Sequence, residues 1–267
     1  MKKIEEYRIV ANLTQNDRLY LLRISPAAPS ARIEKCEPGQ FVEIRVENDP
    51  SVFLRRPISI HRVDYEANIM ELLIQKAGRG TNRLATLKEG DLLNIVYPLG
   101  HGFTIGSNRE NYLLVGGGVG IAPLLELGIE LNNHNKKVTF LLGGRTANDL
   151  VRIEEYAKYG TVWVTTEDGS TIDGYDCQKG FVTQHTGFKD GVFDAVRVCG
   201  PLPMMKAVGA KVSTWKRVQE PDFCEVSLEN KMACGLGVCL CCVEDTKEGN
   251  LCVCKDGPVF DINRLKW

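Results

Sequence analysis

Four cysteines near the end of the chain have a spacing that suits an iron–sulfur cluster. Cys234, Cys239 and Cys242 follow the pattern C-x4-C-x2-C, and Cys254 comes after a gap of eleven residues. This is the plant-type spacing for a [2Fe–2S] site, in which three thiolates converge from one loop and a fourth arrives from a later segment. Two glycines in the same loop allow its tight turns. The pattern predicts a carrier of single electrons.

Two other uses of these cysteines remain open at this point. The CxxC of Cys239 and Cys242, with Cys252 and Cys254 downstream, could form a zinc knuckle, although a C-x-C second hook matches such sites poorly. A disulfide set is also conceivable, because six cysteines crowd into residues 234–254. Cys241 and Cys252 are surplus to the cluster pattern, so we do not expect them to be ligands.

Composition narrows the class of protein. The chain has 267 residues, of which 43% are hydrophobic and 25% charged, and its net charge is -1. These values are ordinary for a globular protein with two domains and a small appendage. We find no basic stripe for nucleic acid and no polybasic run for a membrane surface. The N-terminus has no secretory signal, and no run of about 18 apolar residues occurs. We therefore expect a cytoplasmic protein with no membrane partner.

The first third of the chain reads as β structure. The run FVEIRVE at 41–47 alternates Val42, Ile44 and Val46, expected to face inward, with charged residues expected to face outward. Five further short strands are expected: YRIVANL, RLYLLRIS, RPISIHRV, IMELLIQ and LLNIVYPLG. Six short strands at this spacing predict a small closed antiparallel barrel over residues 1–104.

The middle of the chain changes to an alternation of strands and helices. Apolar strands are expected at 112–115, 138–142, 161–166 and 195–199, and helical spacing follows Pro123. This pattern is typical of a parallel sheet covered by helices, which we assign to residues 105–220. Residues 221–267 are rich in cysteine and glycine and are expected to fold around a metal centre. The predicted fold is thus a β barrel, an α/β domain and a small cluster-binding domain.

Two motifs in the barrel region suit a bound flavin nucleotide. Arg56 and Ser59 lie within LRRPISI, where arginine offers a planar fork of donors for phosphate oxygens. About twenty residues later, Gly78-Arg79-Gly80-Thr81 offers a glycine turn with N–H groups and a hydroxyl, an arrangement that binds anions. Either motif alone could be a solvated surface feature, but together they predict a site for the pyrophosphate of FAD.

A glycine-rich turn in the middle region suits a second nucleotide. The run VGGGVGIAP follows an apolar strand and opens a helix, and it contains Gly116, Gly117, Gly118 and Gly120. Glycines let a ligand approach the backbone, and a helix N-terminus favours phosphate. Two further segments end later strands: GGRT, with Arg145, and CGPLPMM, with Cys199, Gly200 and Pro201. Ligands bind at such carboxyl ends in α/β sheets. Arg145 could bind a 2′-phosphate or only end its strand, so the residues leave NAD and NADP open.

These motifs together resemble the ferredoxin reductase superfamily, and within it the electron-transfer subunits of B-type dihydroorotate dehydrogenase. The likeness extends over essentially the whole chain through RRPISI, GRGT, GGGVGIAPLL, GGRT, CGPLPMM and MACGLGVC…VCKDGPVF. It implies that Cys199 lies beside the nicotinamide and that Cys234, Cys239, Cys242 and Cys254 bind the [2Fe–2S] cluster. It also implies an FAD site made by Arg56, Pro57, Ile58, Ser59, Leu73, Ile74, Gln75, Gly80 and Thr81.

The resemblance also implies a function and a partner. Members of that family pass electrons from a separate FMN-containing catalytic subunit through the cluster and FAD to NAD in pyrimidine (UMP) biosynthesis, as a heterotetramer with two copies of each subunit. The alternative is a subunit of similar build from a ferredoxin–NADP oxidoreductase, sulfide dehydrogenase or hydrogenase complex. A protein of a different class, a redox sensor or zinc-stabilised binding module, would lack the flavin and nicotinamide motifs. A flavin exchanges both hydride and single electrons, so it belongs between nicotinamide and cluster.

Overall fold

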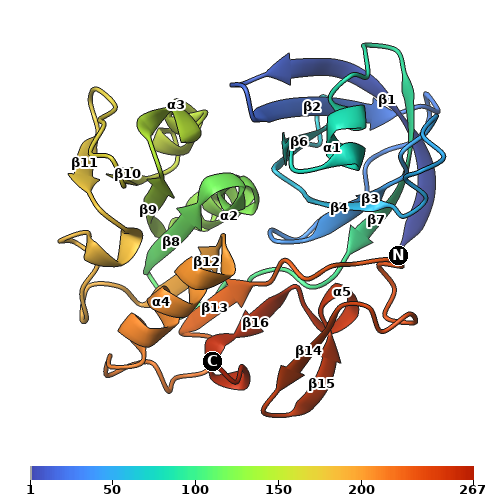
Figure 1. Cartoon of the computed structure of the whole chain (residues 1–267). Helices are drawn as coiled ribbons and strands as arrows, with labels where there is room; N and C mark the ends of the chain where they lie inside the picture. The colour runs from blue at the N-terminus through green and yellow to red at the C-terminus, as the bar shows by residue number, and fades with distance from the viewer. Residues whose placement is uncertain (1) are drawn as a thin grey trace.

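The N-terminal part of the protein is a curled antiparallel sheet of seven strands (Figure 1). The computed structural model describes residues 2–267. The strands lie in the order β4-β3-β7-β1-β2-β6-β5. Their bounds are β1 (Lys3–Thr14), β2 (Leu19–Pro26), β3 (Phe41–Ile44), β4 (Arg56–Ser59), β5 (Arg62–Asp64), β6 (Ile69–Gln75) and β7 (Leu92–Leu99), and a short helix, α1 (Arg79–Leu84), follows β6.

This sheet differs from the predicted six-stranded closed barrel in strand count and in closure. The segment RPISIHRV, expected as one strand, divides into β4 and β5, which lie at opposite edges of the sheet. Ile60 N–H donates to the carbonyl of Gln40 (3.1 Å), next to β3, whereas His61 N–H donates to the carbonyl of Glu71 in β6 (2.9 Å). The chain therefore crosses from one edge to the other, and no ladder joins β4 to β5 within residues 2–267.

The inside of the curled sheet is an apolar core. Val42, Ile44 and Val46 are buried in it, as the alternation in the sequence predicted. Burial of such side chains stabilises a fold by about 1.5–3 kcal/mol each. The expectation that the intervening charges face solvent is wrong for Glu43, which is 0% exposed. The C-terminal loop covers this side of β3, because a Cβ on Gly235 would lie 2.9 Å from Cγ of Glu43.

The second part is a mixed sheet of seven strands in the order β11-β10-β9-β8-β12-β13-β16, in which only β16 is antiparallel to its neighbour. The four strands predicted in this region are present. The sequence reading missed β11, β13 and β16, which are only three or four residues long. The bounds are β8 (Asn111–Gly117), β9 (Lys137–Gly144), β10 (Thr161–Thr166), β11 (Asp176–Lys179), β12 (Ala195–Cys199), β13 (Cys224–Ser227) and β16 (Val259–Asp261).

Helices cover both faces of this sheet because side chains alternate along its buried strands. In β8, Tyr112 and Leu114 share a core with α2 (Ala122–Asn133) and α3 (Ile153–Ala157). Leu113 and Val115 point the other way and share a core with α4 (Leu202–Val212). The helix predicted after Pro123 is α2. Short 3-10 turns cover Gly118–Ile121, Ala147–Asp149, Val182–Gln184 and Ile262–Arg264. None of the helices formed by residues 2–267 has the length and apolar character of a membrane span.

The cysteine-rich segment leaves the mixed sheet at β13 and returns to it at β16. Between them lie the cysteine loop, the hairpin of β14 (Val243–Thr246) and β15 (Gly249–Cys252), and α5 (Val253–Asp256). Ser227 pairs with Val259, and His101 bridges to Pro258, so this segment contacts both other parts of the molecule (Figure 1). The domain boundaries at 104 and 220 stay predictions.

A buried carboxyl links the two larger parts and should make stability depend on pH. Glu126 of α2 accepts a hydrogen bond from Val63 N–H of β5 (3.1 Å). Burial raises the pKa of Glu126 from 4.5 to about 7, although Val63 N–H opposes the shift. Because the folded protein holds this proton more tightly than the unfolded chain, the stabilisation is complete below pH about 4.5 and is lost as pH rises through about 7.

We expect Glu126→Gln to remove this dependence. From pH 5 to pH 8 the wild type should lose up to about 3 kcal/mol relative to the variant. Thermal unfolding followed by circular dichroism at both pH values measures the difference. Glu89→Gln, which changes an exposed carboxyl, is the control. Equal pH slopes for the wild type and Glu126→Gln would contradict the expectation.

Candidate functional site

Two cavities lie side by side between the curled sheet and the mixed sheet. The smaller, about 270 Å³, is lined by β4, β6 and residues 227–232. The larger, about 660 Å³, lies at the carboxyl ends of β8, β9 and β10. Gln75, Val119 and Glu229 line both cavities, so the two spaces meet. Ligands in the two cavities would therefore be neighbours.

The smaller cavity gathers most of the residues predicted to bind a flavin. Its walls include Pro57, Ile58, Ser59, Leu73, Ile74, Gln75 and Thr81. Arg56 and Gly80 do not line it, but they pack against each other beside it. A Cβ on Gly80 would lie 2.8 Å from Cδ of Arg56, so only a glycine leaves room for this arginine. The apolar walls and the adjacent guanidinium fit a flavin ring with a phosphate chain.

In the glycine turn, the N–H of Gly78 is already engaged within the protein. The N–H groups of Ala77 and Gly78 donate to Oγ1 of Thr81 (3.0 and 3.1 Å). The Thr81 hydroxyl thus caps the start of α1 and is already engaged. The sequence reading also missed Phe41, which lines the cavity and pairs with Ser59 across β3 and β4. The position of Phe41 in the cavity depends on the pairing of β3 with β4, which the sequence alone does not give.

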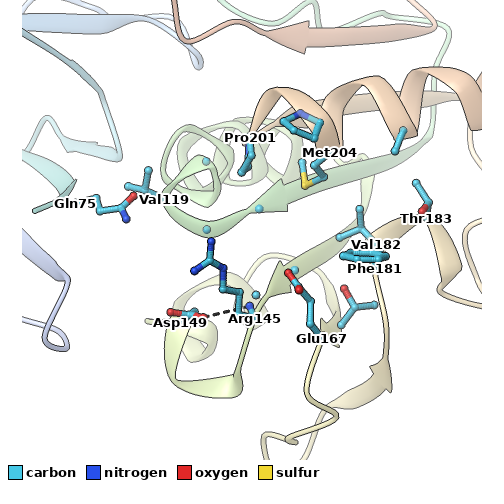
Figure 2. Close-up of a pocket in the computed structure, with 18 of the residues that line it drawn as sticks. Gln75, Val119, Arg145, Asp149, Glu167, Phe181, Val182, Thr183, Pro201 and Met204 are labelled. Carbon is cyan, nitrogen blue, oxygen red and sulfur yellow. Dashed lines mark hydrogen bonds between the residues drawn. The ribbon is translucent and has the colours of Figure 1, made fainter. Parts of the chain in front are cut away.

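The larger cavity gathers part of the predicted nucleotide site. Gly117, Gly118, Gly120, Arg145 and Pro201 line it, and Figure 2 shows Arg145 and Pro201 on opposite sides of it. The lining does not include three of the predicted residues, Gly116, Cys199 and Gly200, which lie beneath the residues that form the cavity surface. A Cβ on Gly120 would lie 2.4 Å from Cα of Gly200, so the two loops touch through their backbones. These glycines allow the loops to approach, and the cavity has the size and place expected for a nicotinamide dinucleotide.

A buried thiol and a cavity-lining carboxyl lie together at the junction of the cavities. Cys199 is buried, and its Sγ lies 3.9 Å from Oε1 of Glu229, which lines both spaces. Burial raises the pKa of the Cys199 thiol well above its usual value, so this thiol stays protonated. Loss of solvation within the cavity also raises the pKa of the Glu229 carboxyl. The sequence reading missed Glu229 because no local motif distinguishes it from the rest of the tail.

The cysteine loop is shaped to present sulfur atoms to a metal centre. Leu236 N–H donates to Sγ of Cys234 (3.3 Å), and Gly237 N–H donates to Sγ of Cys254 (3.1 Å). Gly235 and Gly237 have φ of +66° and +81°, conformations that suit glycine. Burial is the largest influence on the Cys234 thiol and raises its pKa, but nearby N–H groups, led by that of Leu236, lower it to about 6 overall. The loop therefore favours the thiolate form of Cys234, whereas burial raises the pKa of the Cys254 thiol to about 12.

The four predicted ligands interact in two pairs. The Cys234 thiol interacts with that of Cys239, and the Cys254 thiol with that of Cys242. Among residues 2–267, no three histidine, cysteine or carboxylate side chains gather closely enough to hold one metal ion. Cys254 also lies near Cys234, so the four predicted ligands belong to one group of thiols. All ten cysteines are free, so the disulfide alternative finds no support within the described part of the chain.

A buried carboxyl lies between β4, which carries residues predicted to bind a flavin, and the cysteine loop. Both carboxyl oxygens of Glu43 lack a hydrogen-bond partner among residues 2–267. Burial raises the pKa of Glu43 to about 7, although Arg56 and Arg55 oppose the shift. The uncharged acid is thus the form that this site accommodates best. Sequence alternation alone could not find it, because the covering loop comes from almost two hundred residues later.

Family models match the second and third parts of the chain. Residues 229–266 match a family model described as the iron-sulfur cluster binding domain of dihydroorotate dehydrogenase B. Residues 114–210 match the model of an oxidoreductase NAD-binding domain. Both ranges contain predicted site residues: the four cysteines lie in the first, and Gly116 and Arg145 lie in the second.

Curated relatives and a solved structure extend the likeness to the whole chain. Two proteins named dihydroorotate dehydrogenase B (NAD(+)), electron transfer subunit, from Bacillus cereus (strain Q1) and Bacillus anthracis (strain CDC 684 / NRRL 3495), are each 38% identical over 236 residues, with 86% of each chain covered. A structure of an NADH-dependent reduced ferredoxin-NADP oxidoreductase, studied for flavin-based electron bifurcation, is 30% identical with a TM-score of 0.82. It covers 97% of this chain and 89% of that one.

Proposed function

Because the chain belongs to the family of electron transfer subunits of dihydroorotate dehydrogenase B (NAD(+)), we propose that it passes electrons from a catalytic partner through a [2Fe–2S] cluster and FAD to NAD+. The partner would oxidise dihydroorotate in pyrimidine synthesis. The observation that carries this proposal is the meeting of the two cavities at Gln75, Val119 and Glu229. A nicotinamide in one cavity and a flavin in the other would be in contact there.

Each site has residues with a defined task. Arg56 and the turn at Gly80 and Thr81 would hold the FAD pyrophosphate, while β4 and β6 enclose its ring system. The glycine loop at residues 116–120 and the loop at 199–201 would hold NAD at the flavin. FAD, when bound, supplies the exchange between hydride and single electrons. Cys199, buried behind the junction, would help to exclude water from the nicotinamide, and Glu229 would line the cavity beside it.

The cysteine loop supports a partner on its outer side. Val238 and Leu240 are 77% and 64% exposed, and they flank the exposed Cys239. Apolar side chains at this density mark interaction surfaces. We propose that an FMN-containing catalytic subunit docks here and that two copies of each subunit assemble. Ten free cysteines support a reducing, cytoplasmic location. The alternative, a subunit of a ferredoxin–NADP oxidoreductase, has the lower identity, 30% against 38%.

The proposal is tested by isolating the protein with and without its partner. The chain alone should contain FAD, identified by chromatography after extraction, and should reduce an artificial dye with NADH. It should not oxidise dihydroorotate until the catalytic subunit is added. FMN as the only flavin on this chain, or dihydroorotate oxidation by the isolated chain, would overturn the proposal.

A further inference from the structure

The larger cavity has an outer end, remote from the flavin. Gln75 and Val119 lie on the side shared with the smaller cavity, and Figure 2 shows Glu167 and Phe181 on the other side. A dinucleotide that places its nicotinamide at the shared side must extend its adenosine toward this outer end. Residues at this end can contact the adenosine ribose, which carries the 2′-phosphate that distinguishes NADP from NAD.

Two residues near the carboxyl end of β10, Thr165 and Glu167, line this part of the cavity. Thr165 is 1% exposed and lines the cavity, yet its Oγ1 has no hydrogen-bond partner among residues 2–267. Thr165 pairs with Gly143, and a Cβ on that glycine would lie 3.3 Å from Oγ1. The missing side chain of Gly143 therefore leaves room beside this buried hydroxyl. A buried hydroxyl without a partner is costly unless a ligand or water completes it.

Glu167 follows two residues later on the same edge. Its N–H donates to the carbonyl of Gly144 (3.2 Å), which places it beside Arg145 of the neighbouring strand. Both side chains line the cavity. Neither makes a side-chain hydrogen bond or ion pair within residues 2–267, whereas Asp149 is engaged by Arg18 (3.6 Å) and by the N–H of Arg145 (3.1 Å). One free carboxylate and one free guanidinium therefore remain at this end.

We propose that Glu167, supported by Thr165, binds the hydroxyls of the adenosine ribose and makes the site selective for NAD over NADP. The inference rests on the proposed function. The carboxylate accepts hydrogen bonds from a ribose 2′-hydroxyl and repels a 2′-phosphate. Its negative charge also offsets that of Arg145, which alone would favour the phosphate. Phe181, 60% exposed and lining the cavity, offers a flat surface to the adenine of either nucleotide.

The test compares NADH and NADPH on the complete FAD-loaded chain. We expect Glu167→Gln to reduce the ratio of kcat/KM for NADH to that for NADPH by about tenfold or more. Dissociation constants for NAD+ and NADP+, measured from the perturbed flavin spectrum, should shift in the same ratio. Glu154→Gln, an exposed carboxyl on α3 outside the cavity, should leave the ratio unchanged. Phe181→Ala should weaken both nucleotides equally.

The outcomes separate this assignment from the proposed function. Reduction of the flavin by NADH with an unchanged ratio in Glu167→Gln would overturn the role of Glu167 alone. A wild-type preference for NADPH would also overturn it. Reduction by neither nucleotide would overturn both proposals. A tenfold change of the ratio in Glu167→Gln, with equal losses for both nucleotides in Phe181→Ala, would support the assignment.

Discussion

Replacing Cys239 with serine should remove the iron–sulfur centre while NADH still reduces an artificial dye. Cys239 is exposed at the tip of its loop, so the substitution leaves the buried Cys242 and Cys254 and the surrounding core in place. Serine is a poor ligand for iron, and a four-thiolate site does not hold its cluster with three. In the assembled complex, NAD-linked dihydroorotate oxidation should fall by about two orders of magnitude or more.

The measurements are iron content, the electron paramagnetic resonance signal after reduction, and the two activities side by side. Cys241→Ser is the matched control, because this exposed cysteine lies in the same loop but outside the predicted set. It should keep both the signal and the coupled activity. If Cys239→Ser still coupled dihydroorotate to NAD+ at the normal rate, the centre would not lie on the electron path.

Replacing Gly120 with alanine should abolish the use of nicotinamide nucleotides. A Cβ there would lie 2.4 Å from Cα of Gly200 and 2.6 Å from the backbone of Cys199, and backbone atoms cannot rotate away. The two loops must separate, which shifts the wall of the cavity next to the flavin. Because misplacement by about 1 Å can cost a hundredfold in rate, we expect kcat/KM for NADH to fall by about that factor.

The FAD and iron contents should stay at wild-type levels in Gly120→Ala, since Gly120 lines only the larger cavity. Gly106→Ala serves as the control, because Gly106 lines neither cavity and the added carbon would come no closer than 3.2 Å to the flexible Arg109 side chain. Stopped-flow reduction of the bound flavin by NADH measures the effect directly. Normal reduction of the flavin in Gly120→Ala would show that the contact between the two loops does not shape the site.

The sequence predicted those features that short segments determine by themselves. Strands β8, β9, β10 and β12 follow from apolar runs between turns, and the cysteine spacing identifies a metal-binding loop. Features that depend on distant segments were missed. RPISIHRV reads as one alternating strand, although its two halves pair with opposite edges. Glu43 was predicted to face solvent because the neighbouring sequence gives no sign of the loop at Gly235 that covers it.

The same limit explains the candidate sites. Seven of the nine predicted flavin residues line one cavity. Four of them lie in the two motifs RPIS and GRGT, and the other three, Leu73, Ile74 and Gln75, follow from the family resemblance. Phe41, Thr165 and Glu229 became visible only with the fold. Phe41 reaches its cavity through strand pairing, Thr165 through the missing side chain of Gly143, and Glu229 through the return of the tail to the junction. Contacts of this kind depend on register and chain crossing, which a single sequence does not report.

The attachment of the cysteine-rich segment through β13 and β16 has a consequence for handling the protein. β12, whose residues Ala195–Cys199 are all buried, lies between β8 and β13. A chain cut before Cys224 would leave the β12 backbone unpaired along an apolar edge, which is a template for association with other chains. Deleting the cluster segment should therefore give inclusion bodies instead of a minimal flavin reductase. A smaller diaphorase would need a new strand, or a charged residue, to protect that edge.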